Sequence, residues 1–317
     1  MRTTSLLALM VLATMLACAL GILPAQAQPA RVFVAAQGSD ANACTFAAPC
    51  RTFQHAHDVV AAGGEIDVLD PAGYGVLTIN KAISIQGHGF AGISAPGAAA
   101  KAIVINAGAS DKINLRALLI DGVGTGQYGI VFNSGASLNV QDSLIRNFTG
   151  GAIRFVPSAS SQLFVSDTVV TDNAGDGFTI APSGSGSVSV VLERVESDNN
   201  AADGIYVDGS GTTGPINATI SESVFAKNAV HGIEANSSSP SAGGINVMVR
   251  ACSVTGSGVR GVLASQVGVT VRVTRSTITG NAVGWAAASS GTLLSYGDNN
   301  VDGNTTDGTP SGTIPAK

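Results

Sequence analysis

Four residues that could carry out chemistry occupy one recurring position, directly before a glycine that repeats through the chain: Asp176, Asp203, His231 and Arg260. Two carboxylates can supply the acid and the base of glycoside hydrolysis. We therefore take Asp203 as the acid or base and Asp176 as its partner, with His231 relaying protons. The planar guanidinium of Arg260 could hold the carboxylate of an acidic sugar. The position predicts a site with three candidate catalytic residues and one substrate-binding residue.

The four residues can meet only if the chain stacks its repeats. The recurring glycine returns every 22 to 29 residues, at Gly129, Gly151, Gly177, Gly204, Gly232, Gly261 and Gly284. Periods of 20 to 50 residues are typical of solenoids. Equivalent residues on successive turns of a parallel solenoid lie about 4.8 Å apart. At that distance two carboxylates repel each other by roughly 3 kcal/mol at an effective dielectric of 20, enough to raise one pKa.

The strands and corners of each repeat can also be read from the sequence. Apolar residues alternate with polar or small ones, as in Ile216, Ala218 and Ile220, which is the two-residue period of a strand with one buried face. Four residues before the glycine stand corner residues that tolerate left-handed backbone and bond turn amides, namely Asn147, Asn173, Asn200 and Asn228. The alternative interpretation of the reactive position is that it simply faces solvent beside a glycine.

A second column of acidic residues lies two residues after the first strand of each unit: Asp142, Asp167, Glu193 and Glu222, followed by Ala251 and Arg275. Stacked carboxylates can bind Ca²⁺. Exposed turns also collect acidic residues without any ligand. We expect no cofactor, and Ca²⁺ stays open as an alternative.

Single residues with reactive side chains have simpler interpretations. His55 and His57 are two residues apart and do not share a helical face, so surface positions are favoured over a metal site. Trp285 aligns with core positions of other repeats, and Cys252 follows a Val-rich strand and should fill the core. No cysteine pairing of the zinc type is present.

Composition excludes several classes of protein. Among 317 residues there are 40 Gly, only 12% charged residues and 5% aromatics, with a formal net charge of −5. A coiled coil, a charge-rich disordered chain and a basic nucleic-acid binder are all excluded. The apolar core must consist mainly of Val, Ile, Leu and Ala.

The repeated unit D-S-x-I-x-x-N-x-x-x-G-I and the N-terminal segment from Val32 to Tyr74 resemble the right-handed parallel β-helix repeat proteins of the pectin lyase-like superfamily. The resemblance implies an all-β solenoid closed at its N-terminal end by a short capping helix, for which residues 51–62 fit. The order of reactive residues is similar to the polygalacturonase type, whose successive turns carry N-T-D, D-D, G-H-G and R-I-K. This chain departs from that signature at Ala202 and Val262, which replace an aspartate and a lysine, and in lacking the N-T pair.

Two features in the N-terminal part of the chain suggest export. Residues 1–27 combine Arg2, an apolar run and Ala25-Gln26-Ala27, which fits a secretory signal peptide. A lipid anchor at Cys18 is the alternative. Cys44 and Cys50 flank a short loop and favour a disulfide in an oxidising compartment.

We expect residues 28–80 to form the cap and first coil, residues 81–304 the β-helix coils and residues 305–317 a tail.

Two functions fit these observations. The first is a secreted, monomeric protein that binds or hydrolyses an extracellular polysaccharide, with lyase activity less favoured. The second is a non-catalytic surface or adhesive protein that binds a glycan or a protein partner, favoured by the incomplete catalytic signature. We expect no nucleic-acid partner and no transmembrane segment. The fold alone cannot choose between these functions.

Overall fold

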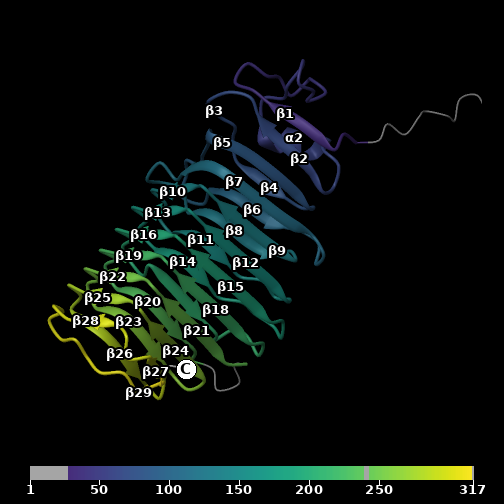
Figure 1. Cartoon of the computed structure of the whole chain (residues 1–317). Coiled ribbons are helices and arrows are strands. Elements are labelled where there is room, and N and C mark those ends of the chain that lie inside the picture. Colours follow the sequence, from purple (N-terminus) through teal and green to yellow (C-terminus); the bar gives the residue numbers. More distant parts are fainter. Residues whose placement is uncertain (1–27, 239–242, 316–317) are drawn as a thin grey trace, which may run out of the picture.

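The computed structural model describes residues 28–238 and 243–315. The predicted signal peptide, residues 1–27, lies outside this part of the chain. The described chain is a right-handed parallel β-helix, as expected, whose turns stack from the purple N-terminal end to the yellow C-terminal end (Figure 1). No helix in the described ranges is long and apolar enough to cross a membrane.

Each turn contributes strands to two parallel sheets. The nine-stranded sheet contains β4 (Leu77–Ile79), β6 (Lys101–Asn106), β8 (Tyr128–Ser134), β11 (Gly151–Phe155), β14 (Asp176–Ile180), β17 (Ile205–Asp208), β20 (His231–Asn236), β23 (Arg260–Ser265) and β26 (Val283–Ala288).

The twenty-stranded sheet takes two strands from most turns, separated by a corner. It contains β1 (Arg31–Val34), β2 (Gly64–Val68), β3 (Ala72–Gly73), β5 (Ile83–Ser94), β7 (Lys112–Asp121), β9 (Ser137–Gln141), β10 (Leu144–Arg146), β12 (Ser161–Ser166), β13 (Val169–Thr171), β15 (Val188–Glu193), β16 (Glu196–Asp198), β18 (Ile216–Ser221), β19 (Val224–Ala226), β21 (Ile245–Arg250), β22 (Ser253–Thr255), β24 (Val269–Thr274), β25 (Thr277–Thr279), β27 (Thr292–Ser295), β28 (Asn300–Val301) and β29 (Gly312–Thr313).

The core lies inside the coil and is built from stacked columns of apolar side chains. In the nine-stranded sheet, Phe178 pairs with Ile205, which pairs with Ile233. The column continues through Val262 to Trp285, whose side chain is buried as the sequence predicts. Cys252 is also buried, as expected of a core filler. Within these strands the alternate positions, such as Tyr206 and Glu234, face outward. At the corner the recurring glycine also faces the core, since a Cβ on Gly204 would meet the side chain of Phe225, so the residue before the glycine faces outward as well.

The corners before β14, β17 and β20 are held by a ladder of three buried asparagines, Asn173, Asn200 and Asn228. Asn200 Oδ1 accepts hydrogen bonds from the backbone N–H and the side-chain Nδ2 of Asn173, at 3.3 and 2.9 Å. Asn228 does the same for Asn200, at 3.2 and 3.0 Å. The left-handed residue is the preceding one, Asn199 with φ 52°. The prediction of amide bonding by Asn173, Asn200 and Asn228 is confirmed, but their expected left-handed backbone is wrong. Asn147, with φ 62°, does have the expected left-handed backbone.

The recurring glycine has a steric cause, seen most clearly at Gly204. A Cβ at this position would lie 2.6 Å from the backbone oxygen of Gly232 on the next turn and 2.7 Å from the side-chain Nδ2 of Asn228. Contacts that short do not occur for real side chains, so only glycine lets neighbouring turns approach at this corner.

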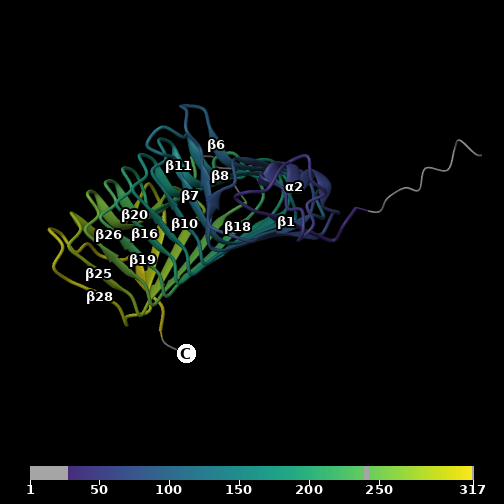
Figure 2. The same ribbon diagram turned by 90° about the horizontal axis from the view of Figure 1, so that it is seen from above.

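The N-terminal end is closed by α2 (Phe53–Val59), which lies beside β1 at the purple end of the coil in Figure 2. The helix is shorter than the expected 51–62 because Thr52 caps it, its Oγ1 accepting from the backbone N–H of His55 at 3.2 Å. Phe53 is fully buried, with its ring centroid 5.2 Å from that of Tyr74. His57 is buried rather than exposed, which corrects the sequence interpretation.

The expected disulfide is present, whereas the C-terminal boundary differs from the expected one. Cys44 and Cys50 form the expected disulfide, with 4.6 Å between their Cα atoms. The sequence predicts a tail over residues 305–317, yet β29 within this range pairs with β27, with Leu294 opposite Gly312. The last described residues therefore extend the sheet.

Candidate active site

Backbone hydrogen bonds between turns align three of the predicted residues on the outer face of the nine-stranded sheet. Asp176 begins β14, Asp203 directly precedes Gly204 and β17, and His231 begins β20. Asp176 Oδ1 accepts from the backbone N–H of Asp203 at 3.2 Å, and Asp203 Oδ1 accepts from the backbone N–H of His231 at 2.8 Å. Each carboxylate thus uses one oxygen to join its turn to the next.

Arg260 continues the same line one turn further on. It pairs in register with His231 between β20 and β23, and its positive charge lowers the pKa of the His231 imidazole. The structure therefore brings together all four residues that the sequence placed in one column. The register of the solenoid is the reason, because equivalent positions become neighbours on adjacent turns.

Glu234 is the member of the site that the sequence reasoning missed. Its carboxylate lies 3.6 Å from Nε2 of His231, and it shares a hydrogen bond with the Asp203 carboxyl group. One ligand-type atom from each of Asp203, His231 and Glu234 lies within 4.8 Å of the others. Glu234 pairs in register with Tyr206, and each lies three residues after a member of the predicted column, His231 and Asp203 respectively. Comparing the positions two residues after each glycine would have revealed it.

Burial sets the protonation states of this cluster. Burial, with repulsion from Glu234 and Asp176, raises the pKa of Asp203 to about 8. Burial also raises the pKa of Glu234 and of Asp176. Burial and the nearby guanidinium of Arg260 lower the pKa of His231 to about 4. At neutral pH the cluster therefore contains a protonated carboxylic acid beside an uncharged imidazole.

Exposure separates the groups that can touch a ligand from those beneath them. Asp203 and His231 are only 6% and 5% exposed. Asp176, Tyr206, Glu234 and Arg260 are partly exposed. The partly exposed residues form the surface that a bound chain would contact, and Asp203 and His231 lie beneath it. Nδ1 of His231 is buried without a hydrogen-bond partner among the described residues.

A cation is a poor match for the cluster, although its donor atoms are close together. One oxygen of Asp203 already accepts a backbone N–H, and burial favours the protonated form of this acid. The positive charge of Arg260 acts on the same site. Both features oppose a second positive charge, so the arrangement suits proton transfer better than metal binding.

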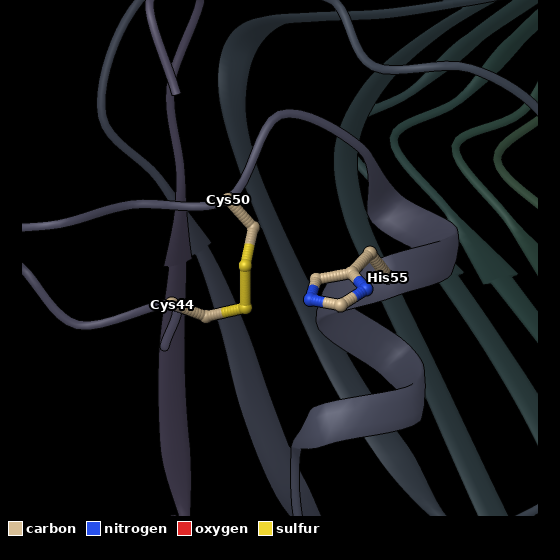
Figure 3. Close-up of side chains that lie close together, drawn as sticks. All are labelled: Cys44, Cys50 and His55. Atoms are coloured by element: carbon tan, nitrogen blue, oxygen red, sulfur yellow. A yellow bond between two sulfur atoms is a disulfide. The ribbon is translucent and has the colours of Figure 1, made fainter. Parts of the chain in front are cut away.

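A second group of metal-type residues, at the N-terminal end, is also unsuited to a metal. His55 on α2 lies beside Cys44 and Cys50 (Figure 3). Both sulfur atoms are joined in the disulfide, so neither offers the thiolate that binds metals.

The acidic column considered for Ca²⁺ is interleaved with arginines. Asp142 Oδ2 lies 2.8 Å from Nε of Arg116, and Asp167 Oδ1 lies 2.7 Å from Nε of Arg194. The left-handed corner position is held by Arg194 and not by Glu193, so the sequence alignment was shifted there by one residue. Because Asp142 and Asp167 have guanidinium partners, ion pairing accounts for their place in the column.

Comparison with known proteins agrees with this architecture. The family model described as "Right handed beta helix region" matches residues 64–241, so the chain belongs to the right-handed parallel β-helix proteins. No curated protein matches the sequence.

Two solved structures share the fold. The pectate lyase Pel9A is 14% identical, with 90% of this chain and 78% of that chain covered and a TM-score of 0.53. The A-module of the mannuronan C-5 epimerase AlgE6 from Azotobacter vinelandii is 17% identical, with 83% of this chain and 94% of that chain covered and a TM-score of 0.51. At this identity the likeness defines the fold and leaves the activity to the site.

Proposed function

We propose that this protein acts on an acidic polysaccharide, with its chemistry on the outer face of the nine-stranded sheet. The observation that carries the proposal is the Asp203, His231 and Glu234 cluster, whose reactive atoms lie within 4.8 Å of one another. Both structures compared above are named for enzymes that act on polysaccharides, a pectate lyase and a mannuronan epimerase. Arg260 beside the cluster supplies a positive group for a sugar carboxylate.

Hydrolysis follows from the protonation states of the carboxyl groups. The proton shared by Asp203 and Glu234 persists at neutral pH because the pKa of Asp203 is about 8. Glu234, the more accessible of the pair, passes this proton to the glycosidic oxygen, and the proton taken from the attacking water afterwards returns to the pair. Asp176 on the preceding turn acts as the base that activates water. His231 lies beneath as a neutral proton acceptor.

A second candidate reaction is favoured by the neutral imidazole. With a pKa of about 4, His231 is unprotonated at neutral pH and can receive, through the partly exposed Glu234 at 3.6 Å, a proton that Glu234 takes from a sugar carbon. Arg260 would stabilise the charge that develops on the neighbouring sugar carboxylate. Loss of a ring proton next to that carboxylate leads to elimination or epimerisation rather than hydrolysis.

One set of assays separates these reactions. The protein is incubated with polygalacturonate, alginate and a panel of neutral glycans. New reducing ends without an unsaturated product support hydrolysis, whereas unsaturated ultraviolet absorbance supports elimination and a changed NMR spectrum without cleavage supports epimerisation. We expect hydrolysis, with a rate that falls as pH rises through about 8 and the acid loses its proton.

Substitutions in the Asp203, His231 and Glu234 cluster test whether it is responsible for the activity. Asp203→Asn and Glu234→Gln should each lower the rate by about a hundredfold or more, the usual contribution of a general acid. Glu196→Gln changes an exposed carboxylate on β16, in the other sheet, and should leave the rate unchanged. Glycan binding without product, unaffected by these changes, would favour the non-catalytic surface protein instead.

The same proposal includes the place of action. The Cys44–Cys50 disulfide is typical of proteins that work in an oxidising compartment. We propose a secreted protein that meets its polysaccharide outside the cytoplasm. Fractionation of cells that express the full chain tests this, with the protein expected in the exported fraction.

A further inference from the structure

A groove lies on a different face of the solenoid from the candidate active site, over the last turns of the twenty-stranded sheet. It has a volume of about 630 Å³, within the range of ligand-binding pockets. Its walls come from β21, β24 and the segment after β27, near the yellow end of Figure 1. The acid–base cluster lies on the nine-stranded sheet, so the groove is separate from it.

The register of the sheet gathers three arginines in this groove. Arg250 ends β21, and Arg272 lies on β24 opposite Met248. Arg275 follows β24 at a left-handed corner with φ 49°. All three line the groove together with Tyr296.

Two of these guanidiniums, Arg272 and Arg275, lack the close carboxylate partner that several other arginines of the solenoid have. Arg116, Arg146 and Arg194 each lie within 3.0 Å of a carboxylate. Within the described ranges, neither Arg272 nor Arg275 has a carboxylate at ion-pair distance. Arg272 donates only to the neutral Oδ1 of Asn246, at 3.3 Å.

The remaining charges near the groove are too few to neutralise it. Arg250 lies 3.7 Å from Glu222 at the rim. Asp298 is the acidic residue of the lining, and its two oxygens accept from the Thr274 hydroxyl at 2.7 Å and from the backbone N–H of Arg275 at 3.1 Å. Three arginines against one aspartate leave the lining with a charge of about +2, in a chain whose net charge is −5.

We propose that this groove is a second, non-catalytic binding site for a carboxylate-bearing sugar chain. Guanidinium groups bind carboxylates through two parallel hydrogen bonds. The ring of Tyr296 and the thioether of Met248 supply the apolar surface against which a sugar ring can lie. The choice of an acidic glycan as the polymer rests on the proposed function. The net negative charge of the chain repels polyanions at long range, so retention by this site must come from local contacts.

Native electrophoresis in gels that contain polygalacturonate, alginate or neutral dextran tests the groove without using catalysis. The full chain should be retarded by at least one acidic polymer and not by dextran. The double variant Arg272→Ala/Arg275→Ala should bind that polymer about tenfold more weakly, because two charge contacts are lost. It should still turn over a short oligosaccharide that occupies only the nine-stranded face.

The matched control is Arg116→Ala/Arg194→Ala, which removes the same charge from paired arginines. It should keep the retardation. Equal loss in both double variants, unchanged retardation in Arg272→Ala/Arg275→Ala, or no retardation of the full chain would overturn the proposal. Asp203→Asn separates the two sites, because it should remove turnover and leave retardation intact. Absence of turnover with specific retardation would refute the proposed function alone.

Discussion

Replacing Asp203 by asparagine should make the protein more stable at neutral pH. The folded protein holds a proton on this carboxyl group up to a pKa of about 8, whereas its ordinary value is 3.8. Between pH 3.8 and 7 the folded state therefore binds a proton that the unfolded chain has lost, and stability falls as pH rises. Roughly three pH units at about 1.4 kcal/mol each give about 4 kcal/mol at pH 7.

Asparagine removes this penalty because it is neutral at every pH. Its side-chain oxygen can still accept the backbone N–H of His231, and its amide can donate to Glu234 as the protonated acid does. The gain in stability should be close to zero at pH 4 and grow to about 4 kcal/mol at pH 7. Activity should be lost at the same time, as is common when a catalytic group that lowers stability is replaced.

The assay is urea unfolding at several pH values between 4 and 7, followed by the fluorescence of Trp285, the one tryptophan of the chain. His231 acts in the opposite direction between its lowered pKa of about 4 and its ordinary value of 6.5, because there the unfolded chain gains a proton that the folded state excludes. Only the difference between variant and wild type isolates Asp203. Asp302→Asn, at an exposed position, should change stability by less than about 0.5 kcal/mol.

A gain that does not grow with pH, or an Asp203→Asn protein less stable than wild type at pH 7, would refute the reasoning. Either result would mean that Asp203 is ionised in the folded protein. The hydrogen bond from His231 would then outweigh the cost of burying the charge.

Three further changes test the solenoid itself. Gly204→Ala should destabilise the protein by about 3 kcal/mol, since its Cβ would lie 2.6 Å from the backbone oxygen of Gly232; a thermal melt close to that of wild type would contradict the steric argument. Asn200→Ala should cost about 3 kcal/mol in urea unfolding, because it removes a buried side chain that bonds both neighbouring turns, and an effect below about 1 kcal/mol would show that the ladder adds little. Cys44→Ala/Cys50→Ala should lose about 2 kcal/mol, the value for so short a closed loop, and reductant should then have no effect on the variant's melting temperature.

Much of the fold followed from short-range patterns. The two-residue alternation, the recurring glycine and the corner asparagines each repeat, so a single geometric rule applied to all turns. That rule also aligned Asp203 with His231, which the structure joins through a backbone hydrogen bond. In a stacked repeat, residues one period apart in the sequence lie next to each other in space. In folds without repeats, sequence separation does not identify spatial neighbours in this way.

The site could be predicted only in part, because the residues at one repeated position do not reveal which residues at another repeated position will contact them. Glu234 lies three residues after His231, and its contact with that imidazole depends on which way both side chains leave the strand. His57 likewise has the polarity of a surface residue, yet the helix turns it inward. Such orientations are decided by how the helix and strands pack together.

The sequence by itself determined the repeat, the parallel register, the disulfide loop and the line formed by Asp176, Asp203, His231 and Arg260. Only the tertiary structure decided the protonation states in that line, because burial and neighbouring charges, not residue type, hold a proton on Asp203 and remove one from His231. It also decided where charge remains free: arginines occur throughout the sequence, but their pairing depends on which carboxylates the stacked turns bring within reach.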